Sequence, residues 1–502
     1  MKKKELIIIL GSLLVVVLSV TLAYFTTEIF GTGKDISLDS ANLKITFSSG
    51  SGNISGVNIE PGWSSGISTF TVKNESNDTY KYNIVIKELV NTFVTTGFLK
   101  YKITSADGGY NMSDFKDVPK SITQKDTILA YSVEIAKGTT HTYSVEFKYE
   151  NSTTEDQSDD MGKKLSGTLF IEKGTDKPLT LAEKIIEDRT IETTTRGGAY
   201  NTVFTEDTTG KLFQTTESIA GAAAKTVYYF AGAPTDNWLK FANFYWRLIR
   251  TNHDGSIRLL YAGTSPDTTS GYIGTSAFNS SYNSPKYAGY MYGTDGSLSE
   301  SRTNTNDSTI KTYIDNWYST NLSSYTKYIS TEAVYCNDRQ LDSGQTWSIS
   351  YEFDYITYTR LDWAGNGSNA SPIYDCADSH DAFSATNADA KLTYPISLMT
   401  ADEINIAGGL AGNEAPAYYY LNSAGGSVTG STWWWSLSPV SWMGDYPHVW
   451  LVYGSGYDTS GHLEDYSVND SYGVRPVISI KADALWSSGD GSSASPYEIV
   501  YN

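Results

Sequence analysis

The sequence predicts a mainly β, multidomain protein, in which an N-terminal helix precedes a β-sandwich domain and then an α+β domain. Residue composition, alternating apolar residues and frequent turn residues predict this together. The chain has 38 Tyr and 43 Gly among 502 residues, and Tyr is favoured on strands whereas Gly is favoured in turns. This length is enough for two or three domains.

An apolar run near the start predicts a signal peptide or transmembrane helix within residues 1–33. Lysines occupy positions 2–4, and residues 6–25 contain no charge. A helix of this length spans about 30 Å, the thickness of a bilayer core. The basic end is expected to stay in the cytoplasm, so the rest of the chain is exported. The run either anchors the protein in the membrane or is cleaved after about Ala23, because residues 21–23 resemble a signal-peptidase site.

The charge balance argues against nucleic acid as a partner. The formal net charge is -19, whereas binding to phosphates requires a basic face. A strongly acidic surface favours solubility, which suits an exported protein.

The only two cysteines, Cys336 and Cys376, predict one disulfide. An even pair in an exported chain favours a bond, and closing this loop stabilises a fold by about 4 kcal/mol in the chain-entropy model. Redox or metal chemistry of free thiols is the alternative.

Alternating residues predict a β domain over residues 36–175, a sandwich or jelly roll. Residues 143–150 alternate apolar and polar side chains without interruption, which is typical of a half-buried strand. Many short strands between turn residues are typical of these folds. Further strands are predicted at 68–73, 80–86, 99–103 and 167–172.

Residues 176–227 are predicted to form a linker with one short helix. Thr180 and Glu183 have the spacing of a capping box, which predicts a helix over 180–189. Residues 190–227 are rich in Thr, Gly and Ala and are expected to be irregular.

Residues 228–501 are predicted to form the α+β domain. Two apolar strands flank a turn with the sequence His-Asp-Gly, which predicts a hairpin. Helical periodicity and capping residues predict two helices. The hairpin strands are predicted at 244–250 and 257–261, the helices at 310–318 and 400–407, and later strands at 433–437, 449–453 and 474–480.

The first 175 residues resemble the TasA/camelysin family of secreted bacterial matrix proteins. The resemblance rests on residues 23–26 at the end of the apolar run, the strand 41–45, the turn 59–62 with the strand 70–74, and residues 156–163 before the last strand. It implies a jelly-roll-like sandwich, a dedicated signal peptidase and a role in surface fibres. The large C-terminal domain departs from this pattern.

The C-terminal half resembles an uncharacterised surface domain of Gram-positive bacteria and is similar to C-type-lectin-like domains, including the sulfatase-modifying-factor type. The motifs are Phe-Tyr-Trp-Arg at 244–247, residues 394–403, Trp-Trp-Ser-Leu-Ser-Pro at 434–439 and Tyr-Gly-Val-Arg-Pro-Val at 472–477. The resemblance implies a compact α+β fold with a variable loop region that binds a ligand.

The sequence lacks the common local motifs for catalysis and metal binding. The five histidines show no H-x-x-x-H spacing and the cysteines no C-x-x-C, so a local zinc site is not predicted. Nucleophile-elbow, Walker and Rossmann patterns are also absent from the sequence. We expect a protein that is not an enzyme and has no cofactor or metal, with a Ser/His/Asp triad from distant loops as the alternative.

A polar stretch over residues 375–381 permits two interpretations. Its oxygen atoms could hold calcium, which takes six to eight such ligands. The simpler interpretation, which we prefer, is a solvated loop beside the disulfide, because the spacing of a calcium-binding loop is absent. Arg475 is expected to be a structural hydrogen-bond donor.

A predicted aromatic loop at 441–448 is the candidate binding site. Aromatic rings with Asp and His could stack on and hydrogen-bond a sugar or peptide, and loops frequently carry binding residues. The alternative is that the loop folds back on its own domain. Tryptophans 433–435 are expected to pack in the core instead. The candidate ligand-binding residues are Trp442, Asp445, Tyr446, His448, Trp450, Tyr457 and Asp458.

Together these features predict an exported bacterial cell-surface or extracellular-matrix protein, with a β-sandwich stalk that presents a lectin-like adhesive head to a glycan or protein ligand. The first alternative is a matrix fibre subunit that self-assembles through the N-terminal β-sandwich. The second is a secreted enzyme with a loop-assembled site in the C-terminal domain.

Overall fold

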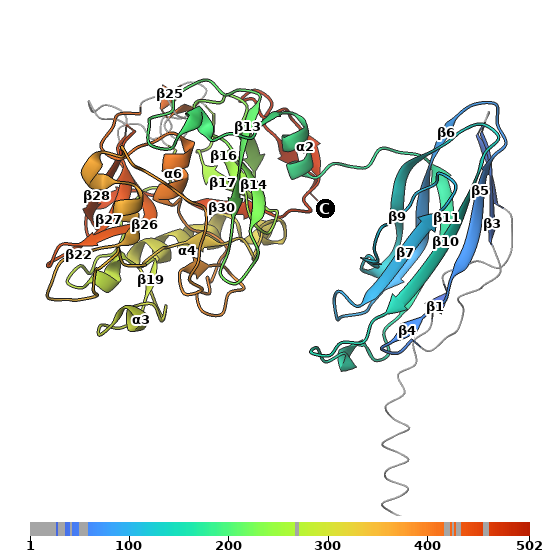
Figure 1. Ribbon diagram of the computed structural model, residues 1–502, viewed down its shortest axis with the longest axis horizontal. Coiled ribbons are helices and arrows are strands. Elements are labelled where there is room, and N and C mark those ends of the chain that lie inside the picture. Colours follow the sequence, from blue (N-terminus) through green and yellow to red (C-terminus); the bar gives the residue numbers. More distant parts are fainter. Residues whose placement is uncertain are drawn as a thin grey trace, which may run out of the picture. The chain divides into compact units, whose positions relative to one another are not determined.

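A computed structural model divides the chain into two compact units, 1–177 and 178–502 (Figure 1). Both are built mainly from strands, which confirms the mainly β, multidomain prediction. The predicted signal or anchor segment lies outside the described residues. Within the described part of the chain, no helix is long and apolar enough to cross a membrane. The structure describes residues 27–28, 36–40, 43–49, 59–266, 271–415, 422–423, 426–427, 433–454 and 461–501.

The first unit contains two sheets, and all five strands predicted in it are present. The four-stranded sheet has the order β1 (Thr27–Glu28), β11 (Leu165–Lys173), β6 (Tyr80–Asn91) and β9 (Ser121–Ile135). The seven-stranded sheet has the order β2 (Ile36–Ser40), β3 (Leu43–Ser49), β5 (Ser68–Asn74), β10 (Thr140–Tyr149), β7 (Leu99–Ser105) and β8 (Lys116–Asp117), with β4 (Trp63–Ser64) paired to β10.

One hydrophobic core joins the two sheets of the first unit. Alternate residues of β10, including Tyr143 and Phe147, are buried, as the sequence alternation predicts. They belong to the same buried cluster as Ile84 of β6 and Leu169 of β11. The 3-10 turn η1 (Ser158–Asp160) precedes β11.

The second unit contains two larger sheets. The seven-stranded sheet has the order β12 (Thr190–Glu192), β13 (Lys211–Glu217), β14 (Lys225–Tyr229), β16 (Phe244–Thr251), β17 (Ile257–Tyr261) and β30 (Val477–Ile480), with β15 (Trp238–Phe241) paired to β16. The six-stranded sheet has the order β18 (Thr275–Ala277), β29 (Ser471–Gly473), β26 (Trp434–Trp442), β27 (Pro447–Val452) and β28 (Leu463–Ser467), with β22 (Phe353–Asp354) paired to β26.

The expected linker differs from the structure. Residues 190–227 are not irregular, because they supply β12, β13 and most of β14 of the seven-stranded sheet. The division between the units instead falls at residues 177 and 178. In this sheet β12 pairs with β13 in parallel, and Tyr229 of β14 lies opposite Arg250 of β16.

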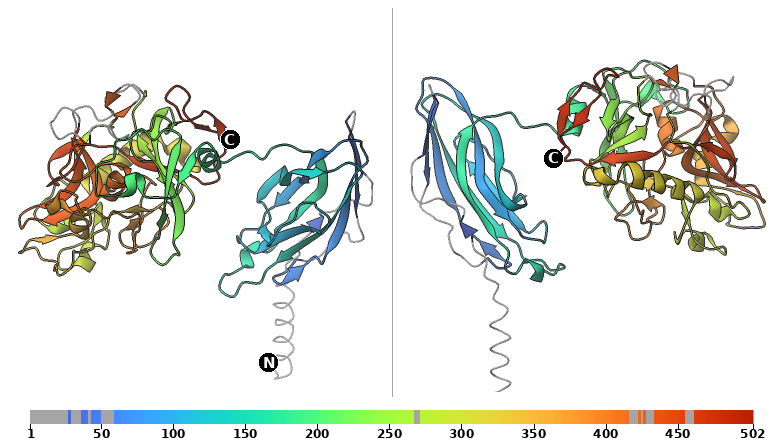
Figure 2. Two further views of the ribbon diagram at one scale, coloured as in Figure 1. Left: turned by 45° about the horizontal axis from the view of Figure 1, so that its top comes forward. Right: turned by 180° about the vertical axis from the view of Figure 1, so that it is seen from behind.

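The predicted helices of the second unit are confirmed. Capping boxes start two of them, with Thr180 and Glu183 on α2 and Thr400 and Glu403 on α6. Apolar residues of α4 belong to the same core as the strands of the seven-stranded sheet, and Figure 2 shows the helix beside that sheet. The helices are α2 (Leu181–Glu187), α3 (Leu298–Ser301), α4 (Thr309–Asn321), α5 (Ile356–Arg360) and α6 (Ala401–Ala407).

Short elements complete the second unit. The two-stranded ladders are β19 (Met291–Tyr292) with β20 (Asn306–Asp307), β21 (Tyr335–Cys336) with β23 (Ala382–Phe383), β24 (Asn422–Ser423) with β25 (Gly426–Ser427), and β31 (Trp486–Ser488) with β32 (Glu498–Ile499). The 3-10 turns are η2 (Arg196–Gly198), η3 (Pro285–Ala288), η4 (Ser323–Tyr328) and η5 (Trp363–Gly365).

Segments from the two ends of the second unit are hydrogen-bonded to each other. The amide of Leu181 donates to the carbonyl of Ala484 at 2.8 Å, and the amide of Trp486 donates to Leu179 at 2.9 Å. β30 completes the sheet by pairing with β17, with Ile257 opposite Ile480. The fold of this unit therefore depends on residues far apart in the sequence.

Candidate functional site

The predicted aromatic loop is a tight turn rather than a long loop. β26 continues to Trp442 and β27 starts at Pro447, which leaves only residues 443–446 between the strands. The amide of Met443 donates to the carbonyl of Tyr446 at 3.1 Å and closes the turn. Gly444 has a φ of 85°, a value that L side chains rarely adopt.

Two candidate binding residues are buried instead. Trp442 is 1 % exposed and Trp450 is fully buried, and both rings belong to the hydrophobic core. All nine residues of β26 are buried, because this strand lies inside its sheet and both of its faces are covered. The prediction that these two tryptophans contact a ligand is therefore wrong. Trp434 and Trp435 are also fully buried, in agreement with the expected core packing.

The remaining candidates divide into three groups. Tyr457 and Asp458 lie outside the described residues. Asp445 is exposed at the turn but does not line a cavity with its neighbours. Tyr446 and His448 do line a cavity, so these two remain candidate binding residues.

This site is an open groove of about 530 Å³, which we call the tyrosine groove. Its lining residues lie on or next to β27 and β28, two strands that Figure 1 shows at the end of the second unit opposite the C-terminus. Tyr282 comes from the segment after β18 and lines the groove together with residues 164 to 188 positions later in the sequence. The lining residues are Tyr282, Tyr446, His448, Asp465, Tyr466, Ser467, Asn469 and Asp470.

Contacts within the groove hold its aromatic rings in place. The ring of Tyr446 stacks on that of His448, with centroids 5.4 Å apart and planes 11° apart. The Nδ1 atom of His448 hydrogen-bonds the carboxylate of Asp465 on the adjacent strand. Tyr446 stays 38 % exposed and Tyr282 is 47 % exposed. Flat aromatic surface therefore faces the solvent on a fixed support.

Polar groups lie beside these rings. The hydroxyl of Ser467 donates to the Oδ1 atom of Asn469 at 2.6 Å, which orients the side-chain amide. Asp470 is exposed at the adjacent position. The groove thus combines aromatic faces with hydrogen-bonding groups, the combination that binds sugars and peptides.

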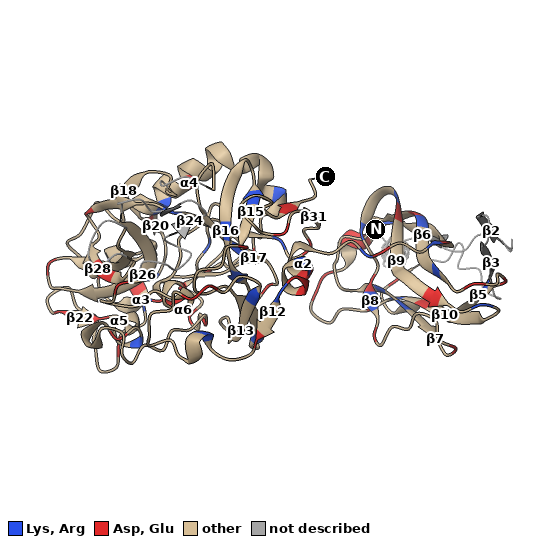
Figure 3. Ribbon diagram, turned by 90° about the horizontal axis from the view of Figure 1, so that it is seen from above, with Lys and Arg blue, Asp and Glu red and all other residues tan. Residues whose placement is uncertain are grey.

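The surroundings of the groove are acidic. Burial raises the pKa of Asp354 above its ordinary value, and the nearby carboxylates of Asp342, Glu352 and Asp465 raise it further. Such an environment favours neutral or amine-bearing ligands over anionic ones, because like charges repel. Figure 3 shows that acidic and basic residues are interspersed elsewhere on both units.

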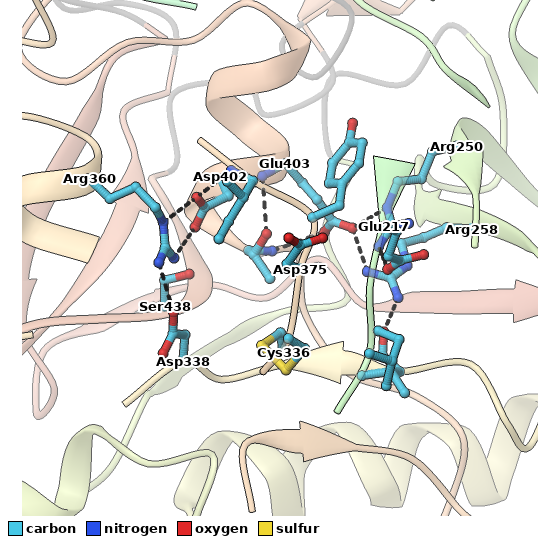
Figure 4. A pocket seen from close by; sticks show the side chains of 16 residues that line it. Glu217, Arg250, Arg258, Cys336, Asp338, Arg360, Asp375, Asp402, Glu403 and Ser438 are labelled. Carbon is cyan, nitrogen blue, oxygen red and sulfur yellow. Dashed lines mark hydrogen bonds and ion pairs between the residues drawn. A yellow bond between two sulfur atoms is a disulfide. The ribbon is translucent and has the colours of Figure 1, made fainter. Parts of the chain in front are cut away.

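A second feature, which we call the charged pocket, lies beneath α6 (Figure 4). Glu403 accepts hydrogen bonds from Arg250, with a distance of 2.9 Å between Nε and Oε1, and from Arg258. Arg250 also pairs with Glu217 at 2.9 Å. All four side chains of this group are at most 2 % exposed.

The other side of the charged pocket repeats this pairing. Arg360 donates two hydrogen bonds to the carboxylate of Asp402, each 2.8 Å long, and a third of 2.8 Å to Asp338. The disulfide between Cys336 and Cys376 forms part of the wall, which confirms the predicted bond. The space inside is about 10 Å³, which leaves room for about one water molecule. The pocket is a structural ion-pair network rather than a ligand site.

Sequence reasoning did not find this network, although one signal was available. Arg250 and Arg258 interrupt the apolar pattern of the hairpin strands, and a charged residue in a buried strand needs a partner. Arg475 acts as the structural donor that was expected. It is fully buried, and its Nε and Nη2 atoms donate to the carbonyl oxygen of Tyr261 at 3.3 and 3.1 Å.

The polar stretch over residues 375–381 is more ordered than a solvated loop. Asp381 is 1 % exposed and accepts from the Nε atom of Arg339 at 2.7 Å. Asp378 accepts from Arg302 at 2.7 Å. Arginines therefore occupy the oxygens that calcium would need, and the described residues contain no group of three or more His, Cys, Asp or Glu arranged to hold a metal.

No known protein family and no curated protein matches this chain. The candidate site is therefore assigned from its own geometry alone.

Proposed function

We propose that this protein is exported to the bacterial cell surface or matrix and that its second unit binds a carbohydrate in the tyrosine groove. In this proposal the first unit is a jelly-roll-like β-sandwich stalk, and the second is a C-type-lectin-like head. The apolar run at residues 6–25 is the export signal or membrane anchor. The protein acts by adhesion and not by catalysis.

The exposed rings of Tyr446 and Tyr282 carry this proposal. The apolar face of a sugar ring stacks on aromatic side chains, and its hydroxyls hydrogen-bond amides and carboxylates such as Asn469 and Asp470. A groove of about 530 Å³ falls in the range of small-molecule sites. The acidic surroundings favour neutral or amine-bearing sugars over anionic ones.

The disulfide supports an extracellular location. Bonds of this kind form and persist in oxidising surroundings and are rare in the cytosol. The charge-free run after three lysines independently favours export, since it has the composition of a targeting segment.

A glycan array and calorimetry test the binding proposal. The full chain in mild detergent is expected to bind a set of neutral or amine-bearing glycans, and Tyr446→Ala is expected to weaken binding at least tenfold. Tyr351→Ala is the matched control, because Tyr351 is 77 % exposed and does not line the groove. The proposal would be rejected if the native protein bound no glycan on a broad array, or if the two variants lost the same amount of affinity.

The fibre-subunit alternative has less support in the first unit. β9 forms an edge of its sheet and could pair with another chain, but its pairing with β6 has four register irregularities. Charged residues such as Lys125 and Glu134 lie along it. Bulges and charges are the devices by which edge strands avoid association. Light scattering of residues 27–502 at high concentration separates the two proposals, since a fibre subunit polymerises and a monomeric head does not.

A further inference from the structure

A second concave surface lies in the second unit, away from the tyrosine groove. Three segments form it: the β15–β16 turn, the 3-10 turn η4, and the chain around β32. Its volume is about 550 Å³. We call it the lysine cleft, and its lining residues are Lys240, Ala242, Asn243, Ser324, Tyr325, Lys327, Tyr328, Glu498 and Tyr501.

Aromatic rings form one wall of the lysine cleft. Tyr501 is 46 % exposed, and its ring packs against Tyr328 and Tyr325 at centroid distances of 5.2 and 6.0 Å. The buried ring of Phe241 lies behind them, 6.2 Å from Tyr501. The backbone amide of Ala242 donates to the hydroxyl of Tyr501 at 3.4 Å. The exposed ring is therefore fixed in place before any ligand arrives, which lowers the entropic cost of stacking.

The charge of the lysine cleft is opposite in sign to that of the whole chain. Two of the lining residues are lysines, Lys240 and Lys327, and one, Glu498, is acidic. The chain as a whole has a formal net charge of -19. Lys240 is half-buried, and its ammonium group lies over the ring of Tyr245, 5.9 Å from the ring centroid. A positive cleft on an acidic protein concentrates anions locally.

The backbone at the rim of the cleft is strained. Ala242 and Asn243 have φ values of 53° and 67° and form the two-residue turn between Phe241 and Phe244. Turns of this type favour Asn-Gly, and the left-handed conformation is unfavourable for an alanine. Strained residues of this kind gather at ligand sites. Asn243 is exposed, so its amide is accessible at the rim.

We propose that the lysine cleft is a second binding site, which takes an anionic sugar unit carrying a carboxylate or a phosphate. The sugar ring stacks on Tyr501 and the tyrosines beside it, and the anionic group pairs with Lys240 and Lys327. Asn243 hydrogen-bonds a ring substituent. The tyrosine groove is acidic and does not accept such a ligand, so the two sites select carbohydrates of different charge.

Calorimetry of the full chain in mild detergent tests this proposal. The probes are a tetrasaccharide of uronic acid, a glycerol-phosphate oligomer, and a neutral tetrasaccharide as the reference. At about 20 mM salt we expect at least one anionic probe to bind and to lose tenfold or more of its affinity at 500 mM, because salt screens exposed charges. Binding of one anionic probe alone identifies the carboxylate or the phosphate as the recognised group.

Substitutions of the lining residues test whether the anionic probe binds in the lysine cleft. Lys240→Gln combined with Lys327→Gln is expected to weaken anion binding at least tenfold, and Tyr501→Ala to weaken it about as much. Lys391→Gln is the matched control, because Lys391 is exposed and lines neither site. Tyr446→Ala is expected to leave anion binding unchanged, which separates this proposal from that for the tyrosine groove.

Three results would overturn the proposal. The first is that neither anionic probe binds at millimolar concentration and low salt. The second is that the double lysine variant keeps its affinity while its unfolding curve is native. The third is that Tyr446→Ala removes anion binding, which would place the ligand in the tyrosine groove.

Discussion

Replacing Glu403 with Gln tests whether the charged pocket stabilises the second unit through charge rather than shape. Glu403 has two structural roles. Its Oε2 atom accepts from the amide of Thr400 at 3.1 Å in the capping box, and its Oε1 atom pairs with Arg250 and Arg258. Gln also serves at this position of a capping box. The substitution therefore keeps the cap and the side-chain volume and removes the charge.

The expected loss of stability depends on which partners each arginine keeps in the variant. Arg250 keeps Glu217 as a partner. Among the described residues Arg258 keeps the carbonyl of Val334 and the ring face of Tyr335, but no carboxylate. Removing one partner of a buried ion pair destabilises a protein by about 3–5 kcal/mol. Because one of the two guanidinium groups stays paired, we expect Glu403→Gln to lower the free energy of unfolding by about 3 kcal/mol.

The matched control is Glu183→Gln in the capping box of α2. Glu183 accepts from the amide of Thr180 at 2.9 Å in the same way, but it is partly exposed. We expect this variant to cost less than about 1 kcal/mol. Urea unfolding followed by tryptophan fluorescence measures both, because of the 12 tryptophans only Trp63 lies outside the second unit.

The effect also has a defined pH dependence. Burial alone would raise the pKa of Glu403, but the guanidinium groups of Arg258 and Arg250 outweigh burial and lower it. The stabilisation is therefore complete above the unfolded pKa of about 4.3 and is lost as the pH falls through the folded pKa. Equal costs for the two glutamine variants at pH 7, or a difference that persists at very low pH, would refute the reasoning.

Three further predictions concern other parts of the chain. Replacing Cys336 and Cys376 with Ser is expected to lower the free energy of unfolding by about 2–4 kcal/mol, since the disulfide spans 40 residues; dithiothreitol should reproduce the loss in the native protein and not in the variant. Asp354→Asn is expected to stabilise the protein slightly at pH 7 and not at pH 3. The reason is that burial raises the pKa of Asp354, so ionisation of this carboxyl above its unfolded pKa opposes folding. A loss of stability at pH 7, measured by urea unfolding, would contradict this. Burial lowers the pKa of His141 in the first unit. The contribution of this residue to stability is therefore present above about pH 6.5 and is lost as the pH falls through the folded pKa. His141→Gln should flatten the dependence of the thermal unfolding temperature on pH between pH 5 and 7, and an unchanged dependence would exclude His141 as its source.

Local chemistry made part of the fold predictable from the sequence. The capping boxes of α2 and α6 depend on residues three positions apart, so Thr180 and Thr400 mark helix starts without knowledge of the rest of the chain. The alternation in β10 is equally local. The disulfide was predictable because the chain has only two cysteines.

Long-range pairing limited the remaining predictions. Trp442 looks like a loop aromatic until β22 and β27 are paired with β26 on either side of it. Trp450 was expected on a strand, but its burial depends on what covers β27, which lies between β26 and β28. Tyr282 reaches the tyrosine groove from a distant part of the sequence, and no local pattern marks it. Periodicity reports the face of an element and does not report which other element covers it.

The pairing of β17 with β30 constrains how the chain is assembled during synthesis. Residues 257–261 can pair with β16 at once, but they find their second sheet neighbour only when residues 477–480 have been made, about 220 positions later. At 5–20 residues per second this takes on the order of 10–45 s. During this interval the edge of β17 that pairs with β30 in the folded unit has no strand beside it. The described strands of the first unit all lie within residues 27–173, so this unit can fold before the second. A chain threaded outward through a membrane would therefore present a finished first unit while the second was still incomplete and in need of protection from aggregation.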